Sequence, residues 1–357
     1  MASQLGWDAE QFRMDLQATL EGFLDEQRAR LSPLGHDAVR LLNQAQLMVR
    51  GGKRLRAAFC FWGYQSVQAE VADRSALLKA CAALELLHAS ALVHDDFMDA
   101  SQVRRGNQTA HRYFAHEHRA ANWTGSALEY GAAGAILLGD LLLSWADELL
   151  RRCGLPSERV TEAMGLFDLC RSEVIVGQFL DVSVQARGRA DVDTAMTVLR
   201  FKSAKYSIER PLHIGAALAG GSDALQQGLG AFGLPLGEAF QLRDDLLGVF
   251  GDPAATGKPA GDDLVEGKRT VLIALALEGS DAETAAELEA ALGTNLDQAG
   301  ITRARHIIET SGAAEQVEAA IDALTAQAIT ALMRAGIEAR ATEVLLSLAQ
   351  AATIRSS

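Results

Sequence analysis

Apolar residues recur along most of this chain at intervals of three and four, the spacing that places them on one face of an α-helix. No alternating run bounded by Asn-Gly or Asp-Gly indicates a β-hairpin. Three stretches break the repeat and are expected to be loops: 101–109, 119–126 and 251–267. The pattern predicts an all-α protein with helices at 10–31, 35–50, 54–72, 74–100, 128–153, 157–188, 191–219, 223–250, 268–279 and, in pieces, 301–353.

The segment 74–100 is apolar around its whole circumference, which is typical of a helix at the centre of a protein. No change of composition marks a domain boundary, and the chain has no repeat of fixed length. We therefore expect one domain over 1–357, folded as a single large bundle of about ten or more helices.

The amino-acid composition excludes some classes of function. Hydrophobic residues are 49% of the 357 residues, which is ample for a large core, and the net charge is −13. The basic residues are scattered, so no nucleic-acid-binding tail or stripe is expected. The longest apolar runs are too short to predict an integral membrane segment, and the first residues lack the apolar region of a signal peptide. The sequence predicts a cytoplasmic protein.

Two residue types that often bind metals are interpreted as structural. The four cysteines lie singly in apolar stretches and form no Cys-x-x-Cys pair, so we expect buried, reduced thiols at Cys60, Cys81, Cys153 and Cys170. His116 and His118 have no further ligands nearby in the sequence. We expect them to face solvent and not to bind zinc.

The first candidate site is an acidic cluster at the end of the central helix. Asp95 and Asp99 are four residues apart, so both carboxylates project from one helix face. Like charges at this spacing repel, and a cation compensates them. Carboxylate oxygens suit Mg²⁺ that is bound together with substrate phosphates. The alternative is a solvated helix end, which the core-like residues before Asp95 disfavour.

A second acidic cluster follows the same logic. Asp244 and Asp245 end another apolar helix, and two such clusters on facing helices build a metal site in a bundle. Cations also recur in this acidic chain, with Arg104 and Arg105 close behind the first cluster. Arg forks and Lys point charges suit diphosphate oxygens. No Ser/His/Asp or Cys/His set indicates a protein nucleophile.

The order of these residues resembles the trans-isoprenyl diphosphate synthases, the family of farnesyl and geranylgeranyl diphosphate synthases. The matching segments cover about 50–272 and are GGKRLR, ELLHASALVHDDFMD, RRG, ILLGD, GQFLD, FKS, ERPL, FQLRDD, TGKPAGDD and EGKRT. The resemblance implies an isoprenoid synthase type of fold with a central active-site cavity, and a homodimer.

The resemblance also implies roles for single residues. Asp95 and Asp99 would hold two Mg²⁺ ions that bind the allylic diphosphate, and Asp244 would hold a third. With Lys202 they form the expected catalytic set. The allylic diphosphate would be contacted by Arg104, Lys202, Gln241, Lys258 and Lys268, with Gln178 and Asp181 nearby. The diphosphate of isopentenyl diphosphate would be bound by Lys53, Arg56, His88 and Arg105. Ser203 stands where the family usually has Thr and keeps the hydroxyl.

One position departs from the family pattern. The second acidic motif is usually DDxxD, whereas residues 244–248 read DDLLG, so Gly248 replaces the last acid. Asp252 follows one turn later. Asp244 still offers a direct metal ligand, but the groups that orient the third metal ion are changed.

The implied reaction is the attack of isopentenyl diphosphate on the cation formed from dimethylallyl, geranyl or farnesyl diphosphate. A class I terpene cyclase shares the first motif but needs no second diphosphate site, which Lys53, Arg56, His88 and Arg105 would form. A catalytically silent partner subunit would be expected to lose the first motif, which is intact here.

Small residues before the first motif bear on product length. Ser90 and Ala91, five and four residues before Asp95, leave the floor of the tail channel open, whereas Leu87 and Leu84 could close it one and two turns deeper. We therefore favour geranylgeranyl diphosphate as the product. Farnesyl diphosphate and longer polyprenyl diphosphates are the alternatives.

Overall fold

The structure, a computed structural model, describes residues 7–188, 191–251 and 261–353. Helices make up nearly all of this part of the chain, which confirms the all-α fold class. They are α1 (Ala9–Leu31), α2 (His36–Met48), α3 (Leu55–Gln65), α4 (Arg74–Met98), α5 (Ala110–Ala120), α6 (Ala127–Arg151), α7 (Ser157–Arg187), α8 (Val192–Leu199), α9 (Arg210–Ala219), α10 (Asp223–Phe250), α12 (Asp262–Glu266), α13 (Val271–Gly279), α14 (Ala282–Ala291), α15 (Gln298–Thr310), α16 (Ala313–Arg334) and α17 (Ala339–Thr353).

Side-chain caps explain why several predicted helices begin where they do. Asp73 accepts a hydrogen bond from the backbone of α4, Ser126 from that of α6, and Ser222 from that of α10. Each satisfies an N–H group that has no partner in the first helical turn. The observed starts of these three helices lie within one residue of the predicted ones.

Several predicted features were wrong. The helix predicted at 54–72 ends at Gln65, and residues 68–70 beyond it are exposed. Three helices, α5, α12 and α14, were not predicted at all. They are short, and α12 and α14 bury one apolar side chain each, Leu264 and Leu288, so they leave little apolar repeat to recognise.

The helix predicted at 191–219 is interrupted by a π-helical segment, Arg200–Glu209, between α8 and α9. Pro211 lies in the first turn of α9 and has no N–H to donate to the carbonyl four residues earlier, at Ser207. A local widening of the helix relieves this conflict, and such widenings are frequent at functional sites. Here the segment carries Lys202 and Ser203 to the site described below.

The loop predicted at 101–109 contains a minimal antiparallel hairpin, β1 (Val103–Arg104) and β2 (Asn107–Gln108). Arg105 and Gly106 at its tip both have positive φ, 51° and 76°, the conformation that a tight two-residue hairpin turn requires. The turn points Arg104 and Arg105 in different directions.

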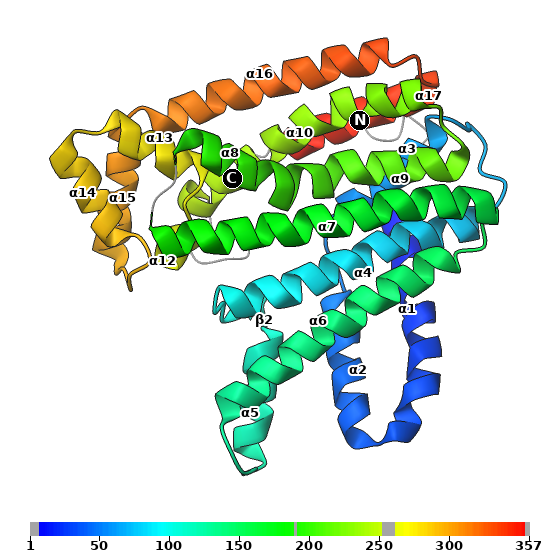
Figure 1. Ribbon diagram of the computed structural model, residues 1–357, viewed down its shortest axis with the longest axis horizontal. Helices are drawn as coiled ribbons and strands as arrows, with labels where there is room; N and C mark the ends of the chain where they lie inside the picture. Colours follow the sequence, from blue (N-terminus) through cyan, green and yellow to red (C-terminus); the bar gives the residue numbers. More distant parts are fainter. Residues whose placement is uncertain (1–6, 189–190, 252–260, 354–357) are drawn as a thin grey trace.

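Figure 1 shows the long helices α4, α7, α10 and α16 running lengthwise along the molecule, with α6 crossing α4 obliquely and α2 and α5 projecting from one side. The closest packing joins α4 to α6, α10 to α16, and α3 to α9. Two buried apolar clusters result. One lies mainly among α1, α3, α4, α6, α7 and α9, and the other among α8, α10, α13, α15 and α16. The chain's single-domain organisation stays a prediction.

The burial of the cysteines and of two histidines can be compared with the predictions for them. All four cysteines are buried free thiols, as expected. His116 is exposed, but the prediction for His118 was wrong, because this side chain is buried. Its Nε2 lies 3.1 Å from the carbonyl oxygen of Thr124, and its ring packs near Trp123 and Tyr130. The face of α5 that carries His118 is therefore a packing face.

Two helices, α4 and α6, are long and apolar enough to cross a membrane by length and composition. In α4, 78% of the apolar window is buried, which is typical of the core helix of a bundle. In α6 the corresponding share is 28%. The neighbouring α7 also exposes apolar side chains. The exposed apolar residues of α6 and α7 are Leu128, Ile136, Leu137, Leu169, Ile175, Val176 and Phe179.

Candidate active site

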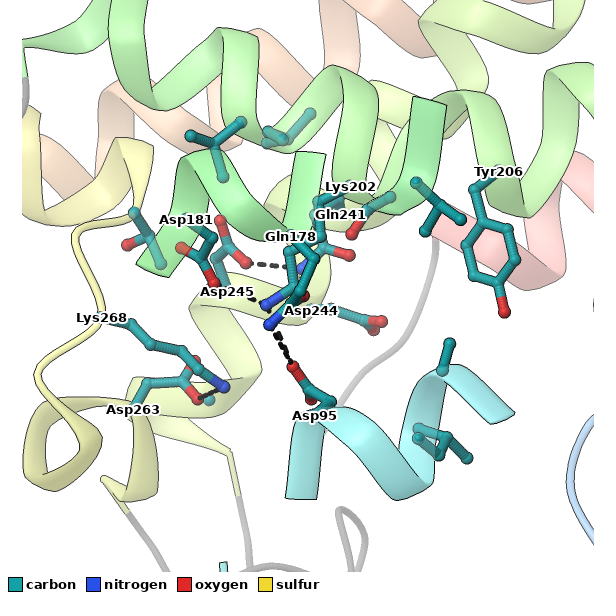
Figure 2. A pocket seen from close by; sticks show the side chains of 18 of the residues that line it. Asp95, Gln178, Asp181, Lys202, Tyr206, Gln241, Asp244, Asp245, Asp263 and Lys268 are labelled. Atoms are coloured by element: carbon teal, nitrogen blue, oxygen red, sulfur yellow. Dashed lines mark hydrogen bonds and ion pairs between the residues drawn. The ribbon is translucent and has the colours of Figure 1, made fainter. Parts of the chain in front are cut away.

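A cavity of about 630 Å³ opens between the two apolar clusters, where α4, α7, α8, the π-helical segment, α10 and the segment around α12 meet. Figure 2 shows acidic, amide and lysine side chains from these elements pointing toward one another. Most of the predicted site residues line the cavity: Lys53, Arg56, His88, Asp95, Arg104, Gln178, Asp181, Lys202, Ser203, Gln241, Asp244 and Lys268. Lys258 lies outside the described residues, and the described lining includes neither Asp99 nor Arg105.

The helix α4 presents one face to the cavity. His88, Ala91, Leu92 and Asp95 line it at the three- and four-residue spacing of a helix face. Gln178 donates a hydrogen bond of 3.0 Å to Oδ1 of Asp95. Burial alone would raise the pKa of Asp95, but the nearby cations outweigh it and lower this pKa to about 2. Asp95 is therefore ionised at neutral pH.

The pKa of Asp99, one turn further along α4, is shifted in the opposite direction. Burial raises its pKa to about 6, and the negative charge of Asp95 adds to the rise. The Nζ atom of Lys268 lies 3.4 Å from Oδ2 of Asp99 and partly compensates. Two carboxylates on one helix face thus repel each other in a partly buried site, as the spacing predicted. A cation bound beside them would relieve this repulsion.

Lys202 connects α4 with α7. Its Nζ lies 2.6 Å from Oδ2 of Asp181 and 3.2 Å from Oδ1 of Asp95. Burial opposes the charge of Lys202, but these two carboxylates outweigh it and raise its pKa, so the ammonium group stays protonated. The π-helical segment therefore places a permanent positive charge directly beside the first acidic motif.

The second acidic motif is divided between two environments. Asp244 lines the cavity and is half-buried, whereas Asp245 is buried. Gln241 donates a hydrogen bond of 2.7 Å to Oδ1 of Asp245. Burial raises the pKa of Asp245 to about 8, and the charges of Asp263 and Asp244 add to the rise. Asp245 therefore carries a proton at neutral pH, which leaves Asp244 as the more accessible carboxyl group of the pair.

Arg243, which precedes these acids in the sequence, points away from the site. Its Nη2 lies 2.6 Å from Oε2 of Glu318 on α16, and its Nε donates to the carbonyl oxygen of Thr353 on α17 at 3.0 Å. The residue fastens α10 to the C-terminal helices and is not a cavity residue.

The cations of the GGKRLR segment have different roles. Lys53 and Arg56 line the cavity, whereas Arg54 is buried and forms an ion pair of 2.8 Å with Glu85. Arg54 has a φ of 57°, a strained value for a residue with a side chain. The buried ion pair compensates this strain and holds the loop so that its two neighbours can face the cavity.

Arg56 and His88 meet at Tyr206, a residue that the sequence analysis missed. The guanidinium of Arg56 lies 4.2 Å from the ring centroid of Tyr206, and the Tyr206 hydroxyl lies 3.0 Å from Nδ1 of His88. Burial lowers the pKa of His88, and Arg56 and Arg105 add to the effect. His88 is therefore a neutral hydrogen-bonding group. Tyr206 lies one helical turn after Ser203 on the same segment, and this spacing could have revealed it.

The two arginines of the hairpin diverge. The Nε of Arg104 donates to both carboxylate oxygens of the buried Asp96, at 2.7 and 2.9 Å, and Arg104 lines the cavity. Arg105 donates to the carbonyl oxygen of Arg50 at 2.8 Å and lies beside Gly52. Arg105 does not line the described part of the cavity, so its predicted contact with a substrate stays a prediction.

The segment around α12 closes the acidic side of the cavity. Lys268 pairs with Glu266 at 2.6 Å and approaches Asp263 at 3.7 Å. Asp262 and Asp263 both line the cavity, although neither was among the predicted site residues. Their motif, TGKPAGDD, was recognised, but its spacing does not reveal that both acids line the cavity.

The donor set fits a magnesium ion. Every acidic residue that lines the cavity is an aspartate, and carboxylate oxygen is a ligand that Mg²⁺ prefers. Across the ranges 7–188, 191–251 and 261–353, no three acidic, histidine or cysteine side chains form a ready-made cluster. Mg²⁺ is usually held by one or two carboxylates together with substrate phosphates and water.

A sequence profile of polyprenyl synthetases matches residues 39–309. The chain belongs to the polyprenyl synthetase family. A crystal structure of geranylgeranyl pyrophosphate synthase from Corynebacterium glutamicum, complexed with isoprenyl diphosphate and magnesium, is 39% identical. It covers 98% of this chain and all of that one, with a TM-score of 0.95.

Curated relatives agree on the family but differ in product. Geranylfarnesyl diphosphate synthase of Aeropyrum pernix is 32% identical over 76% of this chain and 80% of its own length. Geranylgeranyl diphosphate synthase of Mycobacterium tuberculosis is 31% identical over 85% and 88%. This polyprenyl synthetase is a short-chain trans-prenyl diphosphate synthase, a trans-prenyltransferase with the isoprenoid synthase fold.

Proposed function

We propose that this polyprenyl synthetase condenses isopentenyl diphosphate with an allylic diphosphate in a Mg²⁺-dependent reaction, and that its product is geranylgeranyl diphosphate. The observation that carries the proposal is the placement of two acidic motifs and several fixed cations around one cavity. The acids suit metal ions and the cations suit diphosphates.

We assign the two diphosphates to two parts of the cavity. The allylic diphosphate would lie near Arg104, Lys202 and Lys268, where the acids of both motifs converge. Isopentenyl diphosphate would lie near Lys53 and Arg56, on the side of the GGKRLR segment. The assignment is supported by the different elements that carry these cations. Those of the allylic site come from the hairpin after α4, from the π-helical segment and from the segment around α12. Those of the isopentenyl diphosphate site come from the start of α3 and the residues just before it.

Asp95, Asp99 and Asp244 would hold magnesium, with three ions expected when a diphosphate is bound. Magnesium held there would supply positive charge to stabilise the departing diphosphate. Lys202 keeps its proton and offers a donor to the same leaving group, and Gln178 orients Asp95 through their hydrogen bond. Apolar residues of the lining, including Leu92 and Val174, exclude water that would quench an allylic cation.

The expected channel floor needs a correction. Ala91 lines the cavity, but the described lining includes neither Ser90 nor Leu87, both of which are buried. Ser90 is five residues from Asp95 and therefore projects from nearly the opposite face of α4. Ala91 is small and leaves room for a growing tail, which supports a product longer than farnesyl diphosphate. The geranylgeranyl names of two relatives lend further support.

Product analysis tests the proposed chain length. Purified protein is incubated with labelled isopentenyl diphosphate, Mg²⁺ and each of dimethylallyl, geranyl and farnesyl diphosphate, and the products are separated by chromatography. We expect the twenty-carbon diphosphate from all three primers. Accumulation of the fifteen-carbon product, or growth to twenty-five carbons and beyond, would contradict the assignment. An Ala91→Phe variant should shorten the product, and Ser90→Ala should leave it unchanged.

We also propose a homodimer that covers the exposed apolar side chains of α6 and α7. Phe179 is 69% exposed and Leu137 is 60% exposed, and a concentration of large exposed apolar residues on neighbouring helices supports an interaction site there. Sedimentation should give a dimer for the wild type and a monomer for a Leu137→Asp, Phe179→Asp double variant. A monomeric wild type that binds detergent or lipid vesicles through α6 would contradict the proposal.

A cytoplasmic location stays a prediction. It is supported by the four buried free thiols, since unpaired cysteines suit a reducing compartment.

A further inference from the structure

The glycine that replaces the last acid of the second motif lies against an aspartate from another part of the chain. A Cβ atom added at Gly248 would lie 1.9 Å from Oδ2 and 2.5 Å from Cγ of Asp263. Real Cβ atoms do not approach other heavy atoms so closely. The space that a side chain at 248 would occupy beside α10 is therefore filled by the Asp263 carboxyl group.

The position of Asp263 is built into the fold. It lies on α12, which is bounded by Gly261 and Gly267 at φ of 77° and 74°, values that favour glycine. Leu264, the next residue, is fully buried and anchors the short helix in the second apolar cluster. The backbone N–H of Lys268 donates to the carbonyl oxygen of Asp263 at 3.0 Å and closes the turn.

The side chain of Asp263 also faces the reaction site. It lines the same cavity as Asp244 and Asp95, and its Oδ1 lies 3.7 Å from Nζ of Lys268. Lys268 in turn approaches Asp99, so Asp263 is linked through one ammonium group to the first acidic motif. Figure 2 shows Asp263 and Lys268 beside the acids of α10.

We propose that Asp263 supplies, from α12, the carboxylate that the second acidic motif lacks at Gly248, and that glycine at 248 is required to admit it. This inference rests on the proposed function, because the carboxylate would act on magnesium that binds with a diphosphate. Asp252, the next acid after Gly248 along the chain, lies outside the described residues. Asp263 is thus a positioning residue: its carboxylate takes the place of the acid that position 248 lacks.

The proposal predicts that the carboxylate can be moved back to α10. Asp263→Asn keeps the shape of the side chain but removes its charge, and Asp263→Gly empties the space. Gly248→Asp alone places two carboxyl groups in one space, which is sterically and electrostatically unfavourable. The double variant Gly248→Asp, Asp263→Gly restores a single carboxylate there, now carried by α10. Asp322→Asn, an exposed acid on α16, is the matched control.

Binding of inorganic pyrophosphate, measured by calorimetry with and without Mg²⁺, gives a readout other than turnover. We expect Asp263→Asn to weaken Mg²⁺-dependent pyrophosphate binding by about 10–100-fold, the usual effect of losing a group that orients metal ligands. Metal-free binding should change less than about twofold by the same reasoning. Asp263→Gly and Gly248→Asp should each show a comparable loss, and the double variant should bind more tightly than either.

Thermal unfolding without ligand identifies a variant that fails to fold, and Asp263→Asn, which is nearly isosteric, then carries the test. Equal Mg²⁺-dependent binding by wild type and Asp263→Asn would overturn the inference, as would a double variant that binds no better than Gly248→Asp. A wild type whose pyrophosphate binding ignores Mg²⁺ would instead overturn the proposed function, and the inference with it.

Discussion

The two acidic motifs face one cavity but are built in different ways. On α4, Asp95 and Asp99 share a helix face, and surrounding cations hold the pKa of Asp95 at about 2. On α10, Asp244 faces the cavity while burial raises the pKa of its neighbour Asp245 to about 8. Where the third acid is expected, α10 has Gly248, and the Asp263 carboxyl group from α12 fills the space.

The difference shows that one chemical task can be met by local spacing or by tertiary packing. The first motif is complete within a single helix, since residues four apart always share a face. The second is completed only after α12 packs against α10. Substitutions in the first motif should therefore remove metal ligands directly. The effect of a substitution in the second motif should depend on which of its residues is replaced.

The largest effect is expected at the first motif. Asp95→Ala or Asp99→Ala should lower kcat at least about 10³-fold, comparable to losing a strong source of transition-state charge stabilisation. Steady-state kinetics with saturating Mg²⁺ measure this, with Asp322→Asn as the control. Activity of either variant within tenfold of the wild type would show that this motif is not the metal site.

Adjacent acids of the second motif should differ from each other. Asp244→Asn should lower kcat by about 10²-fold, the loss expected when one strong electrostatic group leaves an active site. Asp245→Asn should stay within about fivefold of wild type, because an amide oxygen can still accept the hydrogen bond from Gln241. Equal losses in both variants would remove the distinction drawn between them.

Neutralising one acid in each motif should change the free energy of unfolding of the metal-free protein in opposite directions. The lowered pKa of Asp95 stabilises the fold at all pH values above its unfolded pKa, so Asp95→Asn should cost about 2 kcal/mol at pH 4.5 and pH 7.5 alike. The raised pKa of Asp245 penalises folding as pH rises toward about 8. Asp245→Asn should therefore stabilise the protein, by at least about 2 kcal/mol near pH 7.5 and much less near pH 4.5.

Denaturant unfolding at the two pH values, in the presence of a chelator, measures both differences. If Asp245→Asn destabilises the protein more at high pH than at low pH, the protonated state assigned to Asp245 is wrong.

A smaller effect is expected outside both motifs. Lys53→Ala should raise KM for isopentenyl diphosphate by about 10-fold, the typical value of one charge-assisted hydrogen bond. KM for the allylic substrate should change less than about twofold, because we assign Lys53 to the site of isopentenyl diphosphate alone. Lys79→Ala, an exposed lysine on α4, is the control. A parallel rise in both KM values would contradict the division of the two diphosphate sites.

The sequence predicted those features that depend on neighbours along one helix. The paired carboxylates of α4, the α4 and α10 helices and the four buried thiols all follow from local spacing and apolar pattern. Residues whose direction depends on distant packing were not predictable in this way. Arg54 turns into the core beside cavity-facing Lys53 because Glu85 is buried across from it. The burial of His118 and the contact of Asp263 with the space beside Gly248 likewise require the assembled fold.

The most direct test uses chelator-treated protein, labelled isopentenyl diphosphate and a primer, geranyl or farnesyl diphosphate. Mg²⁺, isopentenyl diphosphate and the primer are each added or omitted, and the remaining primer is measured beside the products. We expect a longer allylic diphosphate and released pyrophosphate only when Mg²⁺ and both substrates are present together. Consumption of the primer without isopentenyl diphosphate, with release of a hydrocarbon, would contradict this expectation and indicate a cyclase. Full condensation in the presence of the chelator would contradict the metal role of both motifs.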